Sequence, residues 1–377
     1  MKFTANSIEL QRTLNKLASV IPSKSPIPIV ENILCELTGD TVTLEATDMA
    51  ISLTVAMQVR GGGDGKITIP AKRLLDTMRS LPDTSAVFTI DTTTNKIKIS
   101  TENGEYNLTG ENAKDFPPAP VFSGGLEFSI DSNELSGIIH RTAFAVSTDE
   151  LRPAMMGVLF QTRGEELHVI STDGHRLVRL IHPESGTPAL KKDILVPVKA
   201  LIVLAKSMEE GNTNISVSDT HIRFSFGQAF LVSRLIEETY PNYEAVIPGD
   251  NNKQMRVKRD ALISSIRRVA LYANATTHQL RFDIEDSQLH VAAQDIDFGG
   301  EAKETLPCTF SADRLEIGFN SQYLIDILTH LDSEEVSFQF STPTKAGIIA
   351  PVAAKPNDGK SRADDVLMLV MPVRLNN

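Results

Sequence analysis

Apolar positions follow a helical period at six places along the chain, and each is flanked by polar positions on the opposite face. This spacing predicts six amphipathic helices, because residues three and four apart share one face of a helix. The stripes are Leu10, Leu14, Leu17 and Ile21; Leu74, Met78 and Leu81; Leu135, Ile139, Thr142 and Val146; Leu201, Leu204 and Met208; Leu262, Ile266 and Val269; and a shorter one between Ser321 and Leu331.

The residues in front of these stripes are typical of helix starts. Asn6 or Ser7 is placed to cap the first helix through its side-chain oxygen. Pro70 and Pro197 announce the second and fourth helices, because proline suits the first helical turn. Asn320 replaces that proline before the last helix and predicts an N-cap there.

Short runs with strand character fill the intervals. We expect strands at 29 to 37, 42 to 46, 87 to 91, 96 to 100, 105 to 109 and 126 to 130, and a last strand from Val366 to Met371. The glycine-rich segment 61 to 66 predicts a hairpin turn. It is not a Walker loop, which would need glycine at Arg60 and serine or threonine at Ile67. The polar stretch 353 to 365 predicts a loop.

The same order of predicted helices and strands recurs three times along the chain. Asp48, Asp173 and Asp295 each follow a strand-like run, at intervals of 125 and 122 residues. A proline-rich linker at 115 to 120 and a polar stretch at 248 to 252 separate the copies. We therefore predict three α+β domains, 1–120, 126–248 and 253–377, each with two helices packed on antiparallel sheets.

Composition is that of a folded protein without a membrane anchor. The 377 residues are 41% hydrophobic and 23% charged, which is enough to build full cores. No run approaches the roughly 20 apolar residues of a membrane span, and the N-terminus lacks a signal-peptide core, so we expect a cytoplasmic protein. Cys35 and Cys308 are expected to be free buried thiols, and neither a metal site nor a cofactor is indicated.

The charge pattern leaves two interpretations open. A net charge of -11 argues against simple adhesion to nucleic acid. Many basic residues nevertheless fall on the predicted helices, where they form either ordinary solvated faces, partly neutralised by acidic neighbours, or a surface turned toward phosphates. They are Arg12, Lys16, Lys72, Arg73, Arg79, Arg141, Lys199, Lys206, Lys258, Arg259, Arg267 and Arg268.

Asp173 and His175 form the best catalytic candidate in the chain. A general base needs a nucleophile and an orienting partner, and no such residue stands near them at a recognisable spacing. Ala50 and Asp297 occupy the position of His175 in the other two copies. We therefore expect Asp173 to cap a turn and His175 to be a surface or pocket residue. A hydrolase using this pair is retained as an alternative.

Four features together carry a resemblance to a family: three sequence segments and the threefold repeat. The start Met1-Lys2-Phe3, the run Thr172-Asp173-Gly174-His175-Arg176-Leu177 and the ending Val370-Met371-Pro372-Val373-Arg374-Leu375 occur with the threefold repeat. The chain thus resembles the bacterial DNA polymerase III beta subunits, the replicative sliding clamps.

The resemblance implies a non-catalytic processivity factor. Two copies of three DNA-clamp domains would close head to tail into a homodimeric ring around duplex DNA, with the helices lining the hole. The ring would tether the replicative polymerase and dock the clamp loader and repair proteins through short hydrophobic peptides. Topology would hold the DNA, so an acidic exterior is compatible with a weakly attractive basic lining. A three-domain scaffold that never meets DNA is the other alternative.

The resemblance also assigns residues to three surfaces. DNA contacts are implied for Lys24 and Lys199, and helix placement adds Arg79, Arg141, Arg267 and Arg268; the last helix carries only His330, so the lining is uneven. The dimer interface would contain Tyr106, Leu271 and Tyr272. The partner-peptide pocket would contain Arg152, Met155, Thr172, Gly174, His175, Arg176, Leu177, Pro241, Val246, Tyr323, Val370, Met371, Pro372, Val373, Arg374 and Leu375.

The sequence departs from the family pattern at three places near the pocket. Ala245 stands where a basic residue is common, Pro153 and Ala154 replace aromatic residues, and Asn376-Asn377 extends the usual end. We therefore expect the peptide preference to differ from that of other members.

Overall fold

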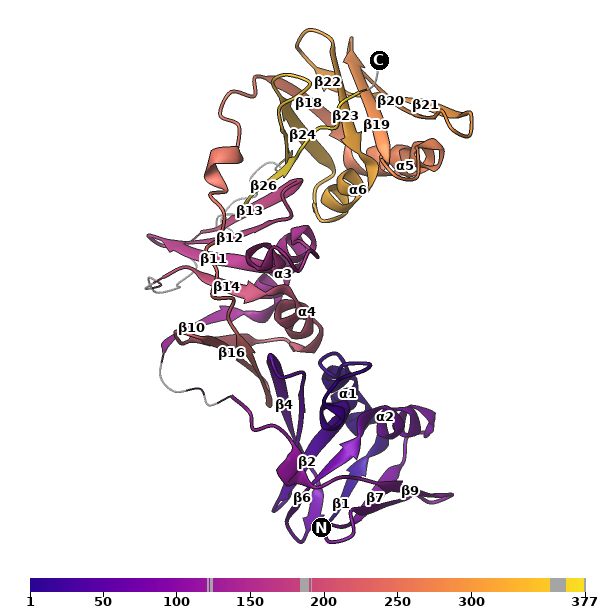
Figure 1. The fold of residues 1–377 in the computed structure, drawn as a ribbon, viewed down its shortest axis with the longest axis vertical. Helices are drawn as coiled ribbons and strands as arrows, with labels where there is room; N and C mark the ends of the chain where they lie inside the picture. The colour runs from indigo at the N-terminus through magenta and orange to yellow at the C-terminus, as the bar shows by residue number, and fades with distance from the viewer. Residues whose placement is uncertain (121, 123–124, 184–189, 191, 353–363, 376–377) are drawn as a thin grey trace. The chain divides into compact units, whose positions relative to one another are not determined.

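The structure is a computed structural model that describes residues 1–120, 122, 125–183, 190, 192–352 and 364–375. All six predicted helices are confirmed within these residues (Figure 1). In each third of the chain, a strand precedes the first helix and three strands follow the second helix. The helices are α1 (Ser7–Ala18), α2 (Ala71–Ser80), α3 (Ser132–Thr142), α4 (Val198–Ser207), α5 (Arg259–Val269) and α6 (Ser321–Thr329).

Side-chain caps fix where the helices begin. Asn6 Oδ1 accepts the N–H groups of Ile8 and Glu9 at 2.9 and 3.1 Å, so Asn6 is the N-cap of α1. Asn320 caps α6 in the same way, as predicted. Pro70 occupies the N-cap position of α2 without a side-chain hydrogen bond. Polar caps satisfy backbone donors that have no partner inside a helix.

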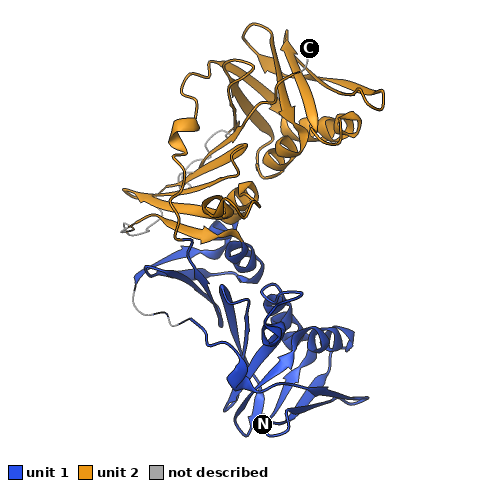
Figure 2. Ribbon diagram, viewed as in Figure 1, with its two compact units in different colours: residues 1–136, 199–236 blue, residues 137–198, 237–377 orange. Residues whose placement is uncertain are grey.

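The chain divides into two compact units, residues 1–136 with 199–236 and residues 137–198 with 237–377 (Figure 2). The first unit contains an eight-stranded and a five-stranded sheet, both antiparallel. The eight-stranded sheet has the order β10 (Leu126–Asp131), β15 (Asn212–Val217), β16 (His221–Phe226), β17 (Ala229–Arg234), β4 (Ile51–Gln58), β3 (Thr41–Thr47), β2 (Asn32–Thr38) and β6 (Gly65–Pro70). The five-stranded sheet has the order β5 (Arg60–Gly62), β1 (Lys2–Asn6), β7 (Ser85–Asp91), β8 (Lys96–Ser100) and β9 (Glu105–Thr109).

The second unit contains a nine-stranded and a four-stranded sheet. The larger sheet has the order β14 (Ile194–Pro197), β11 (Gly157–Arg163), β12 (Glu166–Thr172), β13 (Arg176–His182), β26 (Asp365–Val370), β25 (Gly347–Pro351), β24 (Glu335–Phe340), β18 (Lys253–Lys258) and β22 (Thr309–Phe310). The smaller sheet has the order β21 (Gly300–Pro307), β20 (Gln288–Asp295), β19 (Gln279–Glu285) and β23 (Leu315–Asn320).

Strand pairing joins each repeat to the next. β17 of the middle repeat pairs with β4 of the first, with Leu231 opposite Leu53. β13 of the middle repeat pairs with β26 of the third, with Arg176 opposite Val370. The middle repeat therefore contributes strands to both units, which explains why three repeats give two units.

Each repeat buries the apolar stripes that predicted its helices. Leu14 and Leu17 of α1 are fully buried, and the rings of Phe3 and Phe88 stack with centroids 4.6 Å apart. In the third repeat Phe282, Phe319, Phe338 and Phe340 form a fully buried aromatic cluster. Each such side chain contributes about 1.5–3 kcal/mol through burial.

Two sequence predictions need correction, and a third lies mostly outside the described residues. The strand expected at 29 to 37 begins only at Asn32, because Pro28 starts a short 3-10 helix, Pro28–Glu31. Cys35 is buried, and burial raises the pKa of its thiol to about 12, but Cys308 is only half-buried; both are free thiols. Most of the loop predicted at 353 to 365 lies outside the described residues.

Asp364 ties the middle repeat to the third beside the β13–β26 pair. Its side chain is 12% exposed, accepts a hydrogen bond from His182 Nδ1 at 2.7 Å, and forms an ion pair with Arg141 of α3. Burial alone would raise the pKa of Asp364, but His182 and Arg141 outweigh it and hold the pKa below the usual value of 3.8. The folded state therefore favours the ionised carboxylate.

We expect Asp364→Asn to lower the free energy of unfolding at pH 7 by about 1–2 kcal/mol, because the charge-assisted contacts weaken. A carboxyl group more acidic in the folded than in the unfolded chain stabilises above about pH 4, and that contribution disappears as pH falls through the folded pKa. Urea titrations of the wild type and of Asp364→Asn at pH 7 and at pH 3 measure this contribution to the free energy of unfolding. Asp365→Asn, at an exposed neighbour, is the control. An equal loss of unfolding free energy in Asp364→Asn at both pH values contradicts a stabilising role for the ionised carboxylate.

Candidate functional site

The aspartate turn recurs in all three repeats, after β3, β12 and β20. In each copy one carboxylate oxygen accepts two backbone N–H groups two and three residues further on, which defines an Asx turn. The distances are 3.0 and 2.8 Å for Asp48 to Ala50 and Ile51, 2.8 and 2.9 Å for Asp173 to His175 and Arg176, and 3.0 and 3.4 Å for Asp295 to Asp297 and Phe298. The predicted capping role of Asp173 is confirmed.

Neighbouring groups hold the middle turn rigidly. Thr172 Oγ1 donates to the carbonyl of Arg176 at 2.7 Å and accepts the N–H of Gly174 at 3.1 Å. Gly174 has a φ of +90°, and a Cβ there would lie 3.3 Å from Nη1 of Arg152. That nitrogen donates to the carbonyl of Asp173 at 3.3 Å. The turn thus presents Gly174 and His175 at the surface on a fixed backbone.

Arg176 is the most constrained side chain of this region. Its Nε lies 3.1 Å from Asp173 Oδ2, its Nη1 lies 2.5 Å from Asp326 Oδ2, and its Nη2 donates to the carbonyl of Phe144 at 2.9 Å. The guanidinium also lies over the rings of Phe144 and Tyr323, 5.3 and 5.0 Å from their centroids. Because Asp326 and Tyr323 belong to α6, Arg176 connects the middle repeat to the third.

The C-terminal tail completes this surface. The N–H of Met371 donates to the carbonyl of His175 at 2.8 Å, and the N–H of Val373 donates to the carbonyl of Gly318 at 2.9 Å. A Cβ at Gly318 would lie 2.6 Å from the carbonyl oxygen of Val373, so this approach requires glycine. Val370 is buried in β26, whereas Met371 is exposed beside His175.

Direct contacts bring together part of the predicted pocket set. Thr172, Gly174, His175, Arg176, Tyr323 and Met371 are linked by these hydrogen bonds and ring contacts, with Arg152 at the edge; we call these six residues the Arg176 cluster. Leu177 is buried beneath it. Met155 lies in the short helix Pro153–Met156 that follows Arg152.

The other predicted pocket residues lie in the second linker and at the end of the tail. Val246 is exposed in the short helix Glu244–Val246, after Pro241 and Tyr243. The Tyr243 hydroxyl donates to Gln161 of β11 at 2.8 Å and accepts from Arg163, which anchors the linker. Pro372 is half-buried and Arg374 is exposed.

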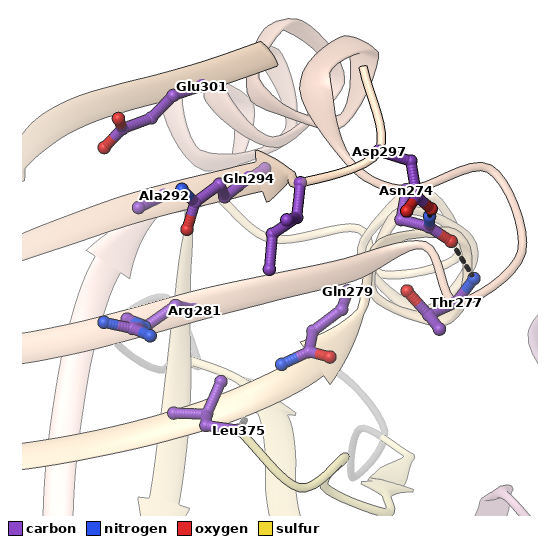
Figure 3. A pocket seen from close by; sticks show the side chains of 11 residues that line it. Asn274, Thr277, Gln279, Arg281, Ala292, Gln294, Asp297, Glu301 and Leu375 are labelled. Atoms are coloured by element: carbon purple, nitrogen blue, oxygen red, sulfur yellow. Dashed lines mark hydrogen bonds between the residues drawn. The ribbon is translucent and has the colours of Figure 1, made fainter. Parts of the chain in front are cut away.

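Leu375 lines a hollow of about 400 Å³ on the four-stranded sheet. Figure 3 shows it with Gln279 and Arg281 of β19 and with Gln294 of β20. Polar and charged side chains dominate the lining, with Asp297 and Glu301 among them.

Sequence reasoning did not find Phe144, Asp326, His140 or His330 in this region. A signal was present on the last helix, where Tyr323, Asp326 and His330 follow one another at the spacing of a single helical face. No local pattern indicates that this face meets Arg176, because that contact joins segments far apart in the chain.

The cations predicted to contact DNA differ in their exposure and in whether a neighbouring side chain already pairs with them. Lys24 and Arg267 are exposed, and Arg79 donates to Asn15 of α1 at 2.5 Å. Lys199 is paired with Asp48, and Arg268 forms two 2.6 Å contacts with Glu304. Within the first unit, Arg12, Lys16 and Lys206 line a hollow of about 480 Å³ between α1 and α4. Arg141 is largely buried against Asp364, which argues against a phosphate contact.

Exposed apolar side chains gather at one end of the third repeat. Leu271 and Tyr272 lie in the short helix Ala270–Tyr272, and Ile296 and Phe298 lie in the turn after β20. Asn274 donates to Asp297 at 3.1 Å and so joins the two segments. In the first repeat, Tyr106 of β9 lines a hollow of about 810 Å³ together with Lys72 and Arg73 of α2.

Two further observations bear on function. No helix in the described ranges is long and apolar enough to cross a membrane. Among the same residues, no three histidine, cysteine, aspartate or glutamate side chains gather in a group that could hold a metal ion.

Comparison with known proteins covers the full chain. Three family models of the DNA polymerase III beta subunit match, the N-terminal domain at residues 1–120, the central domain at 129–242 and the C-terminal domain at 244–368. A beta sliding clamp of Chlamydia muridarum is 28% identical over 379 residues, which is 100% of both chains.

Solved structures agree with these matches. The sliding clamp of Bartonella birtlesii bound to griselimycin superposes with a TM-score of 0.91 at 29% identity, and that of Pseudomonas aeruginosa bound to griselimycin with 0.91 at 28%. Each alignment covers 100% of both chains. The chain therefore belongs to the DNA polymerase III beta subunit family, and its function is that of a DNA sliding clamp.

Proposed function

We propose that two copies of this chain close into a ring of six domains around duplex DNA and act as a non-catalytic processivity factor in the cytoplasm. The observation that carries the proposal is the edge-to-edge pairing of the sheets, β17 with β4 and β13 with β26, because the same kind of pairing can continue between copies. We place the domains at 1–120, 126–248 and 253–377. No cofactor is required, since the proposed function involves no chemical step.

The strands β9 and β21 are the natural edges for this continuation. Each is the last strand of its sheet, and unpaired edges are prone to pair with another chain. Tyr106 lies on β9 beside Lys72 and Arg73, whereas Leu271, Phe298 and the acidic Glu301 lie near β21. Apolar contact and opposite charge therefore both support a dimer in which β9 of one copy meets β21 of the other.

We expect Leu271→Asp to break the dimer, because Leu271 is 81% exposed in one chain and would place an unpaired charge in the interface. Sedimentation analysis should give twice the 41.2 kDa chain mass for the wild type and the single mass for the variant. Leu151→Asp is the control, since Leu151 is equally exposed but lies in the middle repeat. A wild-type chain that sediments as a monomer at micromolar concentration contradicts the ring.

DNA contacts are proposed for the exposed cations on and beside the helices. Lys24, Arg79, Lys199, Arg267 and Arg268 come from the sequence prediction. The hollow between α1 and α4 adds the exposed Arg12 and Lys206 and the half-buried Lys16, which pairs with Glu209. We assign Arg141 instead to the ion pair with Asp364. Phosphate contacts of this kind attract any duplex regardless of sequence, which suits a ring that must slide.

Retention on DNA tests the topology. The protein loaded on nicked circular DNA should stay bound at about 150 mM salt, where exposed charges are screened beyond roughly 8 Å, and should be lost once the DNA is cut to a linear form. Gel filtration of the two samples measures retention. Equal loss from circular and linear DNA contradicts encirclement.

Partner docking is proposed at the six residues of the Arg176 cluster, which we call the docking site from here on, together with Arg152, Met155, Pro241, Val246 and the tail from Val370 to Leu375. Exposed methionine and imidazole groups beside a fixed turn suit a short hydrophobic peptide, because methionine adapts its shape to apolar ligands. Polymerase subunits, the clamp loader and repair proteins are the proposed sources of such peptides. Ala245 and the Asn376-Asn377 extension are proposed to shift the peptide preference.

Griselimycin provides a defined probe, because it is bound to the Bartonella and Pseudomonas clamps named above. We propose that it occupies the docking site, and we expect Met371→Ala to weaken its binding about 5- to 50-fold in calorimetric titration. Met49→Ala is the matched control, since Met49 is an exposed methionine at the equivalent turn of the first repeat. Unchanged affinity for Met371→Ala contradicts the assignment.

A further inference from the structure

Six side chains stack in a continuous series between the middle and third repeats. In order they are His140, His330, Phe144, Arg176, Tyr323 and His175, and we call them the interleaved stack. The ring centroids lie 4.6 Å apart for His140 and His330, 4.0 Å for His330 and Phe144, and 5.8 Å for Tyr323 and His175. The guanidinium of Arg176 fills the interval between Phe144 and Tyr323. Tyr323 of α6 and His330, the C-cap residue of that helix, are thus inserted among four side chains from the middle repeat.

Asp326 of α6 stands between Tyr323 and His330 in the sequence. Tyr323, Asp326 and the C-cap residue His330 follow one another at positions i, i+3 and i+7, the spacing of one helical face. Asp326 accepts from Arg176 through its carboxylate, and its carbonyl accepts from His330 Nδ1 at 2.7 Å. Asp326 therefore contacts members of the stack on both sides of Phe144.

Asp326 is the cross-repeat restraint on the Arg176 guanidinium. The other two polar contacts of that group, Asp173 and the Phe144 carbonyl, both belong to the middle repeat. Arg176 is 11% exposed, so water has little access to replace a lost partner. Among the described residues, the contact that would still hold Arg176 to α6 without the Asp326 carboxylate is the one with the ring face of Tyr323.

We propose that Asp326 is a positioning residue for the docking site, acting through Arg176. By fixing the guanidinium against Tyr323, it sets the Tyr323 and His175 rings before a ligand arrives. A ligand then meets a surface that is already ordered, which lowers the entropic cost of binding. The inference rests on the proposed docking function and goes beyond it by assigning a residue outside the predicted pocket.

Calorimetric titration with the same probe tests the proposal. We expect Asp326→Ala to weaken binding about 5- to 30-fold, by analogy with coupling between residues of one hydrogen-bond network. Asp326→Asn retains an acceptor oxygen for Arg176 and should recover at least half of the loss on a logarithmic scale. Asp332→Ala removes the same charge from an exposed position just beyond α6 and should bind like the wild type.

A double-mutant cycle separates positioning from a general structural effect. If Asp326 acts through Arg176, then adding Asp326→Ala to Arg176→Met produces no further loss, whereas independent effects add. Additive losses, or wild-type affinity for Asp326→Ala, overturn the proposal. If Arg176→Met does not fold, as judged by its thermal transition, the test rests on the affinities of the wild type, Asp326→Asn and Asp326→Ala. Failure of the wild-type chain to bind the probe overturns the docking function itself, which is a distinct result.

Discussion

Strand pairing between repeats is the constraint on which the rest of the structure depends. Every backbone N–H and C=O in a sheet needs a partner, and the edges of the middle repeat find theirs in the neighbouring repeats, at β4 and at β26. The pairing of β13 with β26 fixes Arg176 opposite Val370, which in turn places Met371 beside His175. A shift of one residue in the register of the β13–β26 pair would turn these side chains to the opposite face of the sheet. Backbone hydrogen bonds between the two strands therefore determine the geometry of the docking site.

The sequence predicted the elements well and their partners poorly. Apolar spacing located all six helices, and Asn6 and Asn320 located two of their starts, because these signals are local. The pairing of β4 with β17 left no local trace, because the sequence of a strand does not specify which other strand lies beside it. The docking site shows the same limit. Asp173 and Gly174 predicted its turn from the local sequence. The roles of Phe144 and Asp326 could not be predicted, because they depend on contacts between segments far apart in the chain.

Some of the acidic residues form ion pairs with the cations on the helices. Lys16, Lys199 and Arg268 each have a carboxylate partner, namely Glu209, Asp48 and Glu304. A phosphate must compete with that carboxylate for the cation, so each proposed contact with DNA is weaker than the count of basic residues suggests. Weak, exchangeable contacts would suit the proposed ring, because it has to move along the duplex, and these three carboxylates would help to provide them.

The aspartate turns of the first and middle repeats share one backbone conformation. Met49 and Gly174 adopt similar left-handed conformations, with φ values of +79° and +90°, and Thr47 and Thr172 brace the two turns through the same pair of hydrogen bonds. The two turns nevertheless present different side chains, an exposed methionine at Met49 in the first repeat and an exposed imidazole at His175 in the middle repeat. A difference in side chains alone is therefore enough to give the same turn a different surface chemistry.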